Sequence, residues 1–189
     1  MIALHGWGMT PRRFEGWLRS GMEPPGVSWW IPRGILPCEV SSRKIGYSWY
    51  VFDGDQIALR ASMDEARAYL VRLAEAARRR LAPPAITLLG FSQGGYLASY
   101  VALTRPDLFQ RLVCCCGRPK AEFVDDLDAA RGVRVLVQTG AQDVSLKPEL
   151  IARGVDPLKQ AGLAVVERSY DGDHRMTKEM ARDAATFAA

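Results

Sequence analysis

The chain has 189 residues, of which 48% are hydrophobic and 24% charged, and its formal net charge is +4. This is ordinary globular usage, and it excludes disordered and fibrous chains. The densest basic run, Arg78 to Arg80, ends a helical pattern where cations suit the C-terminal carbonyls, so we expect no nucleic-acid partner. No apolar run is long enough for a membrane span, and the first residues carry no signal-peptide pattern. We expect a single cytoplasmic domain over residues 1–189.

Short apolar runs alternate with helical patterns, which is typical of a parallel sheet with helices on both faces. The chain is therefore predicted to adopt an α/β fold with a mostly parallel sheet of about six strands. The predicted strands cover residues 1–4, 28–31, 85–89, 112–116, 134–138 and 164–169. The predicted helices cover residues 63–81, 94–104, 121–130, 148–161 and 177–187.

Local signals set some of these boundaries. Ser62 with Glu65 reads as a capping box that opens the first long helix. Pro157 is expected to divide the region 148–161 into two short helices, the second beginning at the proline. Residues 23–54 show the weakest helix and strand patterns, and several prolines interrupt them.

The cysteines indicate the redox environment. They are Cys38 and the consecutive Cys114, Cys115 and Cys116. Adjacent cysteines on a strand point to opposite faces, so this trio fits neither a disulfide framework nor a metal site. A reducing cytoplasm suits them best.

The strongest chemical signal is the sequence Gly-Phe-Ser-Gln-Gly at residues 90–94, a G-x-S-x-G motif between a predicted strand and a predicted helix. A serine on such a sharp turn needs small residues two before and two after it, because larger side chains would collide. The turn would lift the Ser92 hydroxyl above the sheet at a helix N-terminus. We predict that Ser92 is a nucleophile; the alternative is a plain glycine-rich turn whose serine caps the helix.

A serine nucleophile needs a base and an acid that orients the base. His174 follows Ser92 in the chain, as the order Ser, Asp, His requires, and is the predicted base. His5 is expected to hold its own loop by packing and hydrogen bonding. Asp143, in a loop after another predicted strand, is the predicted acid, and Asp171 and Asp173 are its rivals.

The oxyanion hole needs two preorganised donors. The backbone amide of Gln93, the residue after the nucleophile, is expected to supply one donor. The amide of Trp7 in the His-Gly-Trp-Gly stretch at residues 5–8 is expected to supply the other. The large Trp7 side chain would cover the pocket or pack in the core. Metal-ligand, P-loop and dinucleotide motifs are absent, so no metal and no cofactor are expected.

Four motifs in order give the chain a family resemblance: residues 4–8, 90–95, 139–143 and 172–174. With them the chain resembles an α/β-hydrolase, most of all the phospholipase/carboxylesterase family that includes acyl-protein thioesterases. Ser-Gln-Gly-Gly at residues 92–95 is the most specific mark, and Ser-Trp-Tyr at 48–50 and Cys-Gly-Arg at 116–118 are further likenesses. The resemblance implies a triad of Ser92, Asp143 and His174, acyl-enzyme chemistry and no cofactor.

The resemblance also sets expectations for the substrate. Family members usually have antiparallel strands before the His-Gly loop; here these are missing, which makes a minimal fold with a sheet edge that a second copy could cover in a homodimer. The expected pocket residues are His5, Gly6, Trp49 and Cys116. No insertion is long enough for a lid, so small esters with short or medium acyl chains are the expected substrates. Acyl-protein thioesterase or lysophospholipase activity, a non-catalytic binding protein and a structural subunit are the alternatives.

Overall fold

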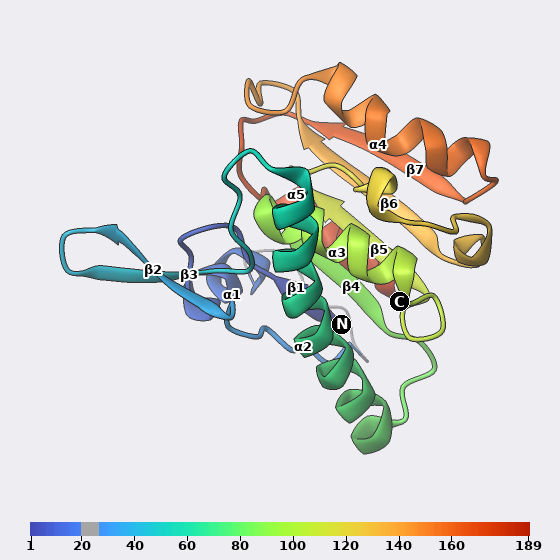
Figure 1. Ribbon diagram of the computed structural model, residues 1–189, viewed down its shortest axis with the longest axis horizontal. Coiled ribbons are helices and arrows are strands. Elements are labelled where there is room, and N and C mark those ends of the chain that lie inside the picture. Colours follow the sequence, from blue (N-terminus) through green and yellow to red (C-terminus); the bar gives the residue numbers. More distant parts are fainter. Residues whose placement is uncertain (20–26) are drawn as a thin grey trace.

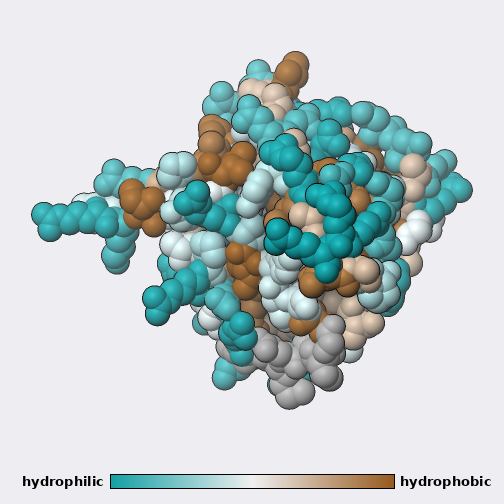
Figure 2. Space-filling view, turned by 90° about the horizontal axis from the view of Figure 1, so that it is seen from below, coloured by the Kyte–Doolittle hydropathy of each residue, from teal (hydrophilic) through white to brown (hydrophobic). Residues whose placement is uncertain are grey.

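The computed structural model describes residues 1–19 and 27–189. Five parallel strands form the central sheet in the order β1-β4-β5-β6-β7. They are β1 (Ile2–Leu4), β4 (Thr87–Phe91), β5 (Arg111–Cys115), β6 (Arg134–Gly140) and β7 (Val165–Tyr170). A separate antiparallel hairpin of β2 (Leu36–Ser41) and β3 (Lys44–Ser48) stands away from the body (Figure 1). Its tip is hydrophilic, as the surface view shows (Figure 2).

Helices cover both faces of the sheet (Figure 1). One face carries α2 (Gln56–Leu81), α3 (Gln93–Thr104) and α4 (Pro148–Gln160), and the other carries α1 (Pro11–Arg19) and α5 (Lys178–Ala188). Each face has its own cluster of buried apolar side chains, and neighbouring strand residues such as Leu88 and Leu89 enter opposite clusters. Cys114 and Cys115 likewise enter opposite clusters. The predicted α/β architecture with a mostly parallel sheet is confirmed.

One predicted strand is wrong. Residues 28–31 form no strand, and only Trp30 makes an isolated parallel bridge with Ile2. The Trp30 amide donates to Met1 O, and Trp30 O accepts from the Ala3 amide, both at 2.9 Å. Pro32 cannot donate to a ladder, which stops the pairing there. The sheet of the described residues therefore has five strands rather than six, and the chain itself covers part of the edge beside β1.

The predicted cap of the long helix is also wrong. The helix α2 begins at Gln56, and the Asp55 carboxylate caps it by accepting from the Ile57 and Ala58 amides. Ser62 lies inside the helix, where its hydroxyl accepts from the Val51 amide at 3.0 Å. An aspartate at the N-cap satisfies two otherwise unpaired donors, so the helix starts earlier than the Ser62 signal suggested.

Three further differences concern local structure. Residues 121–130 form two short 3₁₀ turns, η1 (Ala121–Phe123) and η2 (Asp128–Ala130), instead of one helix. The helix α4 continues through Pro157, which lacks the amide that would donate to Arg153 O, so the single helix forms with one backbone bond fewer. The prediction had no helix at α1 and no hairpin at β2 and β3; the part of the weak region at 23–26 lies outside the described residues. All other boundaries fall within two residues of the predicted ones.

Within the two described stretches, no helix combines the length and the apolar character that crossing a membrane requires.

Candidate active site

A sharp turn between β4 and α3 presents Ser92. Its φ of 53° is in the left-handed region that side-chain-bearing residues rarely adopt. The flanking glycines make room for the turn: a Cβ on Gly90 would lie 2.0 Å from Gly94 O, and one on Gly94 would lie 2.5 Å from Leu4 O. The Ser92 amide donates to Cys115 O at 2.8 Å, which fixes the turn to the end of β5. The motif's glycines are thus required by backbone packing.

We expect Gly90→Ala to destabilise the fold. The added methyl would clash with backbone atoms of α3, which cannot move without shifting the whole turn. The expected loss of unfolding free energy is about 3 kcal/mol, at the upper end for overpacking. Urea unfolding should show this, beside Gly132→Ala as the matched control, because a Cβ there meets nothing within 4 Å. Equal midpoints for the two variants would contradict the argument.

Three side chains from different loops meet at the carboxyl edge of the sheet. Ser92 Oγ lies 2.8 Å from His174 Nε2, and His174 Nδ1 lies 2.6 Å from Asp143 Oδ2. The loop after β6 supplies Asp143, and the loop between β7 and α5 supplies His174. The loops that follow parallel strands gather at one rim, which is why residues so far apart in sequence meet there.

Asp143 is nearly buried and is held by a neighbour that the sequence reasoning did not identify. The Ser145 hydroxyl and amide donate to Asp143 Oδ1 at 2.5 and 3.0 Å. Burial alone would raise the pKa of Asp143, but the hydrogen bonds from Ser145 and His174 outweigh it and keep the pKa below its usual value. The carboxylate therefore stays ionised and orients the imidazole. In the sequence, this role of Ser145 was indicated only by its position two residues after Asp143, because an aspartate side chain often accepts from the backbone amide two residues further on.

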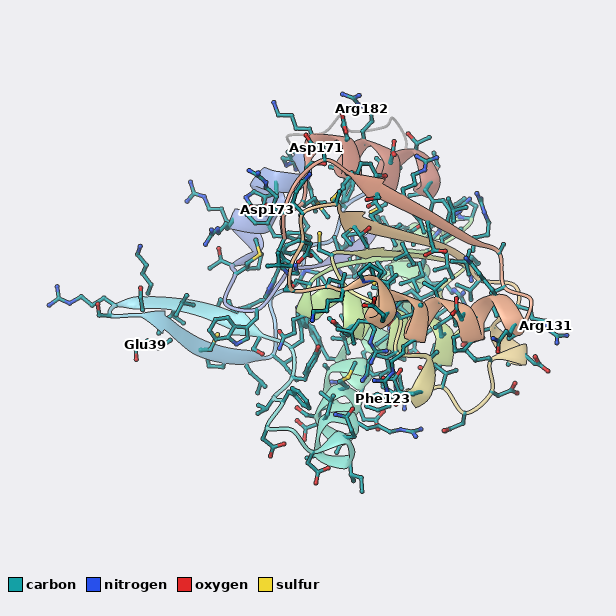
Figure 3. All side chains as sticks on the ribbon, turned by 90° about the horizontal axis from the view of Figure 1, so that it is seen from above. Glu39, Phe123, Arg131, Asp171, Asp173 and Arg182 are labelled. Carbon is teal, nitrogen blue, oxygen red and sulfur yellow. The ribbon has the colours of Figure 1, made fainter. Side chains whose placement is uncertain are left out.

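The two rival acids lie elsewhere. Asp171 accepts from Gln142 Nε2 at 2.8 Å, and Asp173 pairs with Arg175 at 2.8 Å. Both are exposed residues of the loop before α5 (Figure 3). Of the three candidate carboxylates, only Asp143 contacts the His174 ring among the described residues.

The predicted oxyanion donors are the backbone amides of Trp7 and Gln93. Among the hydrogen bonds within residues 1–19 and 27–189, none engages either amide. Gln93 is the first residue of α3, where helix geometry leaves amides unpaired. The Trp7 side chain is 57% exposed, so it lies at the rim and does not pack in the core.

The side chain of Gln93 has a further contact that sequence reasoning did not predict. Its Nε2 donates to Tyr50 O at 2.9 Å, and its Oε1 accepts from the Trp49 amide at 3.1 Å. The Ser48 hydroxyl bonds the same amide group. The residue beside the nucleophile therefore anchors the segment that follows the hairpin. The only feature of the sequence that pointed to this contact was the family-like Ser-Trp-Tyr segment at residues 48–50.

The four residues predicted to line the pocket are all buried. His5, Trp49 and Cys116 have no exposed surface, and Gly6 packs against the Phe91 ring. The His5 ring stacks on Trp49 with centroids 4.9 Å apart. It bonds Gly6 O at 2.8 Å and accepts from the Gly34 amide at 3.1 Å. Burial lowers the pKa of His5, so its ring is neutral and holds the loop.

Cys116 lies directly beside the triad. Its Sγ, a carboxylate oxygen of Asp143 and a ring nitrogen of His174 are within 4.8 Å of one another, which is close enough for a shared cation. Burial raises the pKa of the Cys116 thiol to about 12, so the thiol is protonated, and a thiol is a poor ligand. The other two groups are already hydrogen-bonded to each other. We assign no metal to this group.

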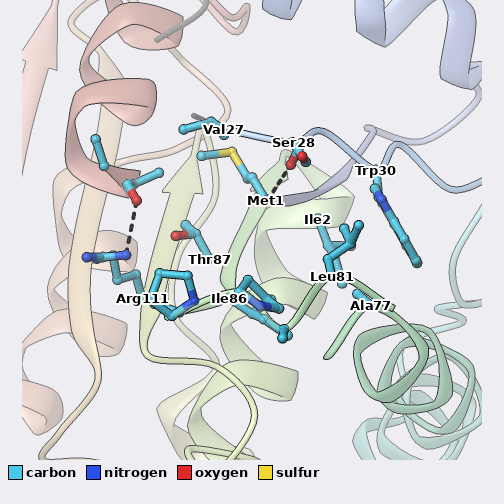
Figure 4. A pocket seen from close by; sticks show the side chains of 16 residues that line it. Met1, Ile2, Val27, Ser28, Trp30, Ala77, Leu81, Ile86, Thr87 and Arg111 are labelled. Carbon is cyan, nitrogen blue, oxygen red and sulfur yellow. Dashed lines mark hydrogen bonds between the residues drawn. The ribbon is translucent and has the colours of Figure 1, made fainter. Parts of the chain in front are cut away.

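Two large cavities lie at opposite ends of the strands. One of about 540 Å³ is lined by residues that begin β1, β4 and β5, among them Ile2, Thr87 and Arg111 (Figure 4). Ser92 follows the other end of β4, so this cavity is remote from the triad. A second cavity of about 670 Å³ lies between α2, α3, η1 and α4 and includes Tyr96, one helical turn after Ser92.

The fold and this arrangement of residues define an α/β-hydrolase. The family model described as the alpha/beta hydrolase fold matches residues 38–144, and the chain belongs to that family. This confirms the membership that the motifs predicted. The comparison with curated proteins gave no match.

Solved structures with the same fold include hydrolases. SOBER1 of Arabidopsis thaliana is 18% identical with a TM-score of 0.80, over 99% of this chain and 95% of that one. A carboxylesterase from Mesorhizobium loti is 22% identical with a TM-score of 0.79, over 98% and 85% of the two chains. A Bacillus cereus carboxylesterase is 15% identical with a TM-score of 0.78, over 100% and 86%. At these identities the likeness shows the fold.

Proposed function

We propose that the chain is a single α/β-hydrolase domain and acts as a serine carboxylesterase on small esters with short or medium acyl chains. The observation that carries this proposal is the hydrogen-bonded series from Ser92 through His174 to Asp143, with distances of 2.8 and 2.6 Å. The series stands at the end of a strained turn, and the amide of Gln93, the residue after the nucleophile, has no partner among the described residues. A turn that only caps a helix has no need of an oriented histidine.

The first half-reaction forms an acyl-enzyme. Ser92 Oγ bonds to the ester carbonyl carbon while its proton passes to His174 Nε2. The carbonyl oxygen becomes an oxyanion that accepts from the Trp7 and Gln93 amides. The intermediate then collapses: the ester carbon–oxygen bond breaks, and His174 returns the proton to the departing alcohol.

The second half-reaction restores the serine. A water gives its proton to His174 Nε2 as its oxygen bonds to the acyl carbon, and the bond to Ser92 Oγ breaks with return of that proton. The products are a carboxylic acid and an alcohol. Throughout, the ionised Asp143 accepts from His174 Nδ1, which keeps Nε2 free to accept a proton. No step requires a cofactor.

The test is intact mass after treatment with a fluorophosphonate, for the native chain, Ser92→Ala and the control Ser169→Ala. Ser169 is an exposed serine on β7 and lies outside the site. We expect one adduct on the native chain and on the control, and none on Ser92→Ala, together with turnover of p-nitrophenyl acetate and butyrate. A folded native chain with no adduct would show that Ser92 is not activated.

A further inference from the structure

Two buried cations line the cavity between α2, α3, η1 and α4. The Arg118 and Lys120 side chains are only 8% and 5% exposed, and both face the cavity of about 670 Å³. Lysine and arginine are rarely buried to this degree unless they are paired. Their partner is the Glu122 carboxylate, which contacts Arg118 at 2.6 Å and Lys120 at 2.8 Å.

The charges around this cavity do not cancel. Its described lining includes three cations, Arg118, Lys120 and the exposed Arg153 of α4, and one carboxylate, that of Glu122. Burial would raise the pKa of Glu122, but hydrogen bonds from Arg118 and Lys120 bring it to about 2, so it contributes one full negative charge. One carboxylate shared by two buried cations leaves an excess of positive charge. A pocket of this kind favours an anionic ligand.

The rest of the wall is apolar. The lining includes the aromatic rings of Tyr50, Tyr96 and Phe123 and the aliphatic side chains of Leu59 and Met63. The Lys120 ammonium lies 4.1 Å from the centroid of the Phe123 ring. A mostly apolar pocket with a few placed polar groups is typical of a small-molecule site. This one suits a hydrocarbon chain that ends in a charged group.

The helix α3 connects the cavity to the nucleophile turn, because Tyr96, which lines the cavity, lies one helical turn after Ser92. The Tyr96 amide donates to Ser92 O at 3.2 Å, and the Lys120 amide donates to the Ser99 hydroxyl at 3.0 Å. Ser99 comes seven residues after Ser92 in α3, which is about 10 Å along the helix axis. A dicarboxylic acid of moderate length could span this distance.

The position of His174 decides which part of an ester extends there. The leaving alcohol must lie next to His174, because it takes the proton from that ring. The His174 ring packs on Phe91, which belongs to the apolar cluster on the face of α1 and α5. The cavity lies on the other face, with Phe123 on the side of α2 and α4 and well away from Asp173 (Figure 3). With the alcohol on the His174 side, the cavity on the opposite face is left for the acyl part.

We propose that this cavity receives the acyl chain and that Lys120 and Arg118 bind a carboxylate at its far end, so that the preferred substrates are monoesters of dicarboxylic acids. This inference rests on the proposed esterase function and names its substrate class. Hydrolysis proceeds through Ser92 as above and yields a free dicarboxylic acid and an alcohol. The substrate carboxylate takes no part in the bond changes; it sets binding and orientation.

The experiment compares matched pairs of esters. Monoethyl esters of succinic, glutaric, adipic and suberic acid are set against ethyl esters of monocarboxylic acids with the same number of carbons. Release of ethanol is followed by proton NMR, and kcat/KM is measured for each ester. We expect the native protein to prefer the charged member of at least one pair by about 10-fold or more, as one charge-assisted hydrogen bond allows.

Variants locate the preference. Lys120→Met keeps the Arg118–Glu122 pair and should lower kcat/KM for the preferred monoester by about 10- to 100-fold while the neutral ester stays within about twofold. Arg153→Gln changes an exposed side chain, so folding is not at risk, and should show a smaller loss of the same kind. The control Arg79→Gln removes an exposed charge in the last turn of α2 and should retain the native preference.

A native protein that hydrolyses neutral esters at least as well as charged ones would overturn the inference and leave the esterase function standing. Equal losses for both esters in Lys120→Met, with the native preference retained in Arg153→Gln, would also overturn it, because Lys120 would then only support the fold. If no ester is cleaved and the fluorophosphonate does not label Ser92, the proposed function itself fails and the inference falls with it.

Discussion

Replacing Ser92 or His174 by alanine should lower kcat for p-nitrophenyl butyrate by about 10⁶-fold, which is the loss seen when a triad nucleophile or base is removed. Each residue contributes nothing without the other: the hydroxyl needs a proton acceptor 2.8 Å away, and the imidazole has no other reacting partner. The double variant should therefore be no slower than either single one. Steady-state rates with highly purified protein measure this.

A surface variant close to the base serves as the control. Lys178 is the exposed first residue of α5, four residues after His174, and Lys178→Ala should keep native kcat. The midpoint of thermal unfolding should be similar for all these variants, because neither Ser92 nor His174 belongs to the buried apolar clusters. If Ser92→Ala retained more than about a thousandth of the native rate, the nucleophile would be a different residue.

The motif at residues 90–94 was readable from the sequence because its requirements are local. Glycines at 90 and 94 are needed wherever a strand turns so sharply into a helix, and the contacts their Cβ atoms would make show the same constraint in space. The positions of His174 and Asp143 followed from the topology, because loops after parallel strands share one rim. Buried parallel strands were equally readable as continuous apolar runs.

Elements held by tertiary contacts were not readable in the same way. The turn of the β2–β3 hairpin uses Arg43 at a φ of 69°, without the Asn-Gly or Asp-Gly pair that usually marks such turns. The exposed hairpin is held at its base, where the Gly8 amide donates to Tyr47 O and the Tyr47 amide donates to Met9 O, both at 3.0 Å. Long-range pairs of this kind leave no periodic pattern in the sequence.

The pocket was the hardest part to predict for the same reason. Trp49 is the tryptophan of the family-like Ser-Trp-Tyr segment, yet its indole donates inward to His5 O at 2.8 Å and is fully buried. Arg118 belongs to the Cys-Gly-Arg likeness, but no pattern in the sequence indicated that Arg118 and Lys120 line a cavity. Their segment is held by distant parts of the chain: the Lys120 amide donates to the Ser99 hydroxyl, and Gly154 of α4 lies against Pro119.

Asp143→Asn is expected to lower kcat by about 10⁴-fold while the protein remains folded. The carboxylate accepts from His174 Nδ1 and so fixes the tautomer in which Nε2 can accept the serine proton. An asparagine of nearly the same shape can turn its amide NH₂ toward Nδ1. The ring proton would then reside on Nε2, and Ser92 would lose its base. Ester hydrolysis measured near neutral pH gives the size of the effect.

The variants Asp171→Asn and Asp173→Asn test whether Asp143, and not a rival aspartate, orients His174. Both aspartates come within three residues before His174, but their side chains bind Gln142 and Arg175, so each change should leave kcat within about threefold. If Asp173→Asn matched the loss in Asp143→Asn, the acid would have been misassigned. Loss in Asp143→Asn alone would show that the hydrogen bond across the sheet rim, and not closeness in sequence, orients the base.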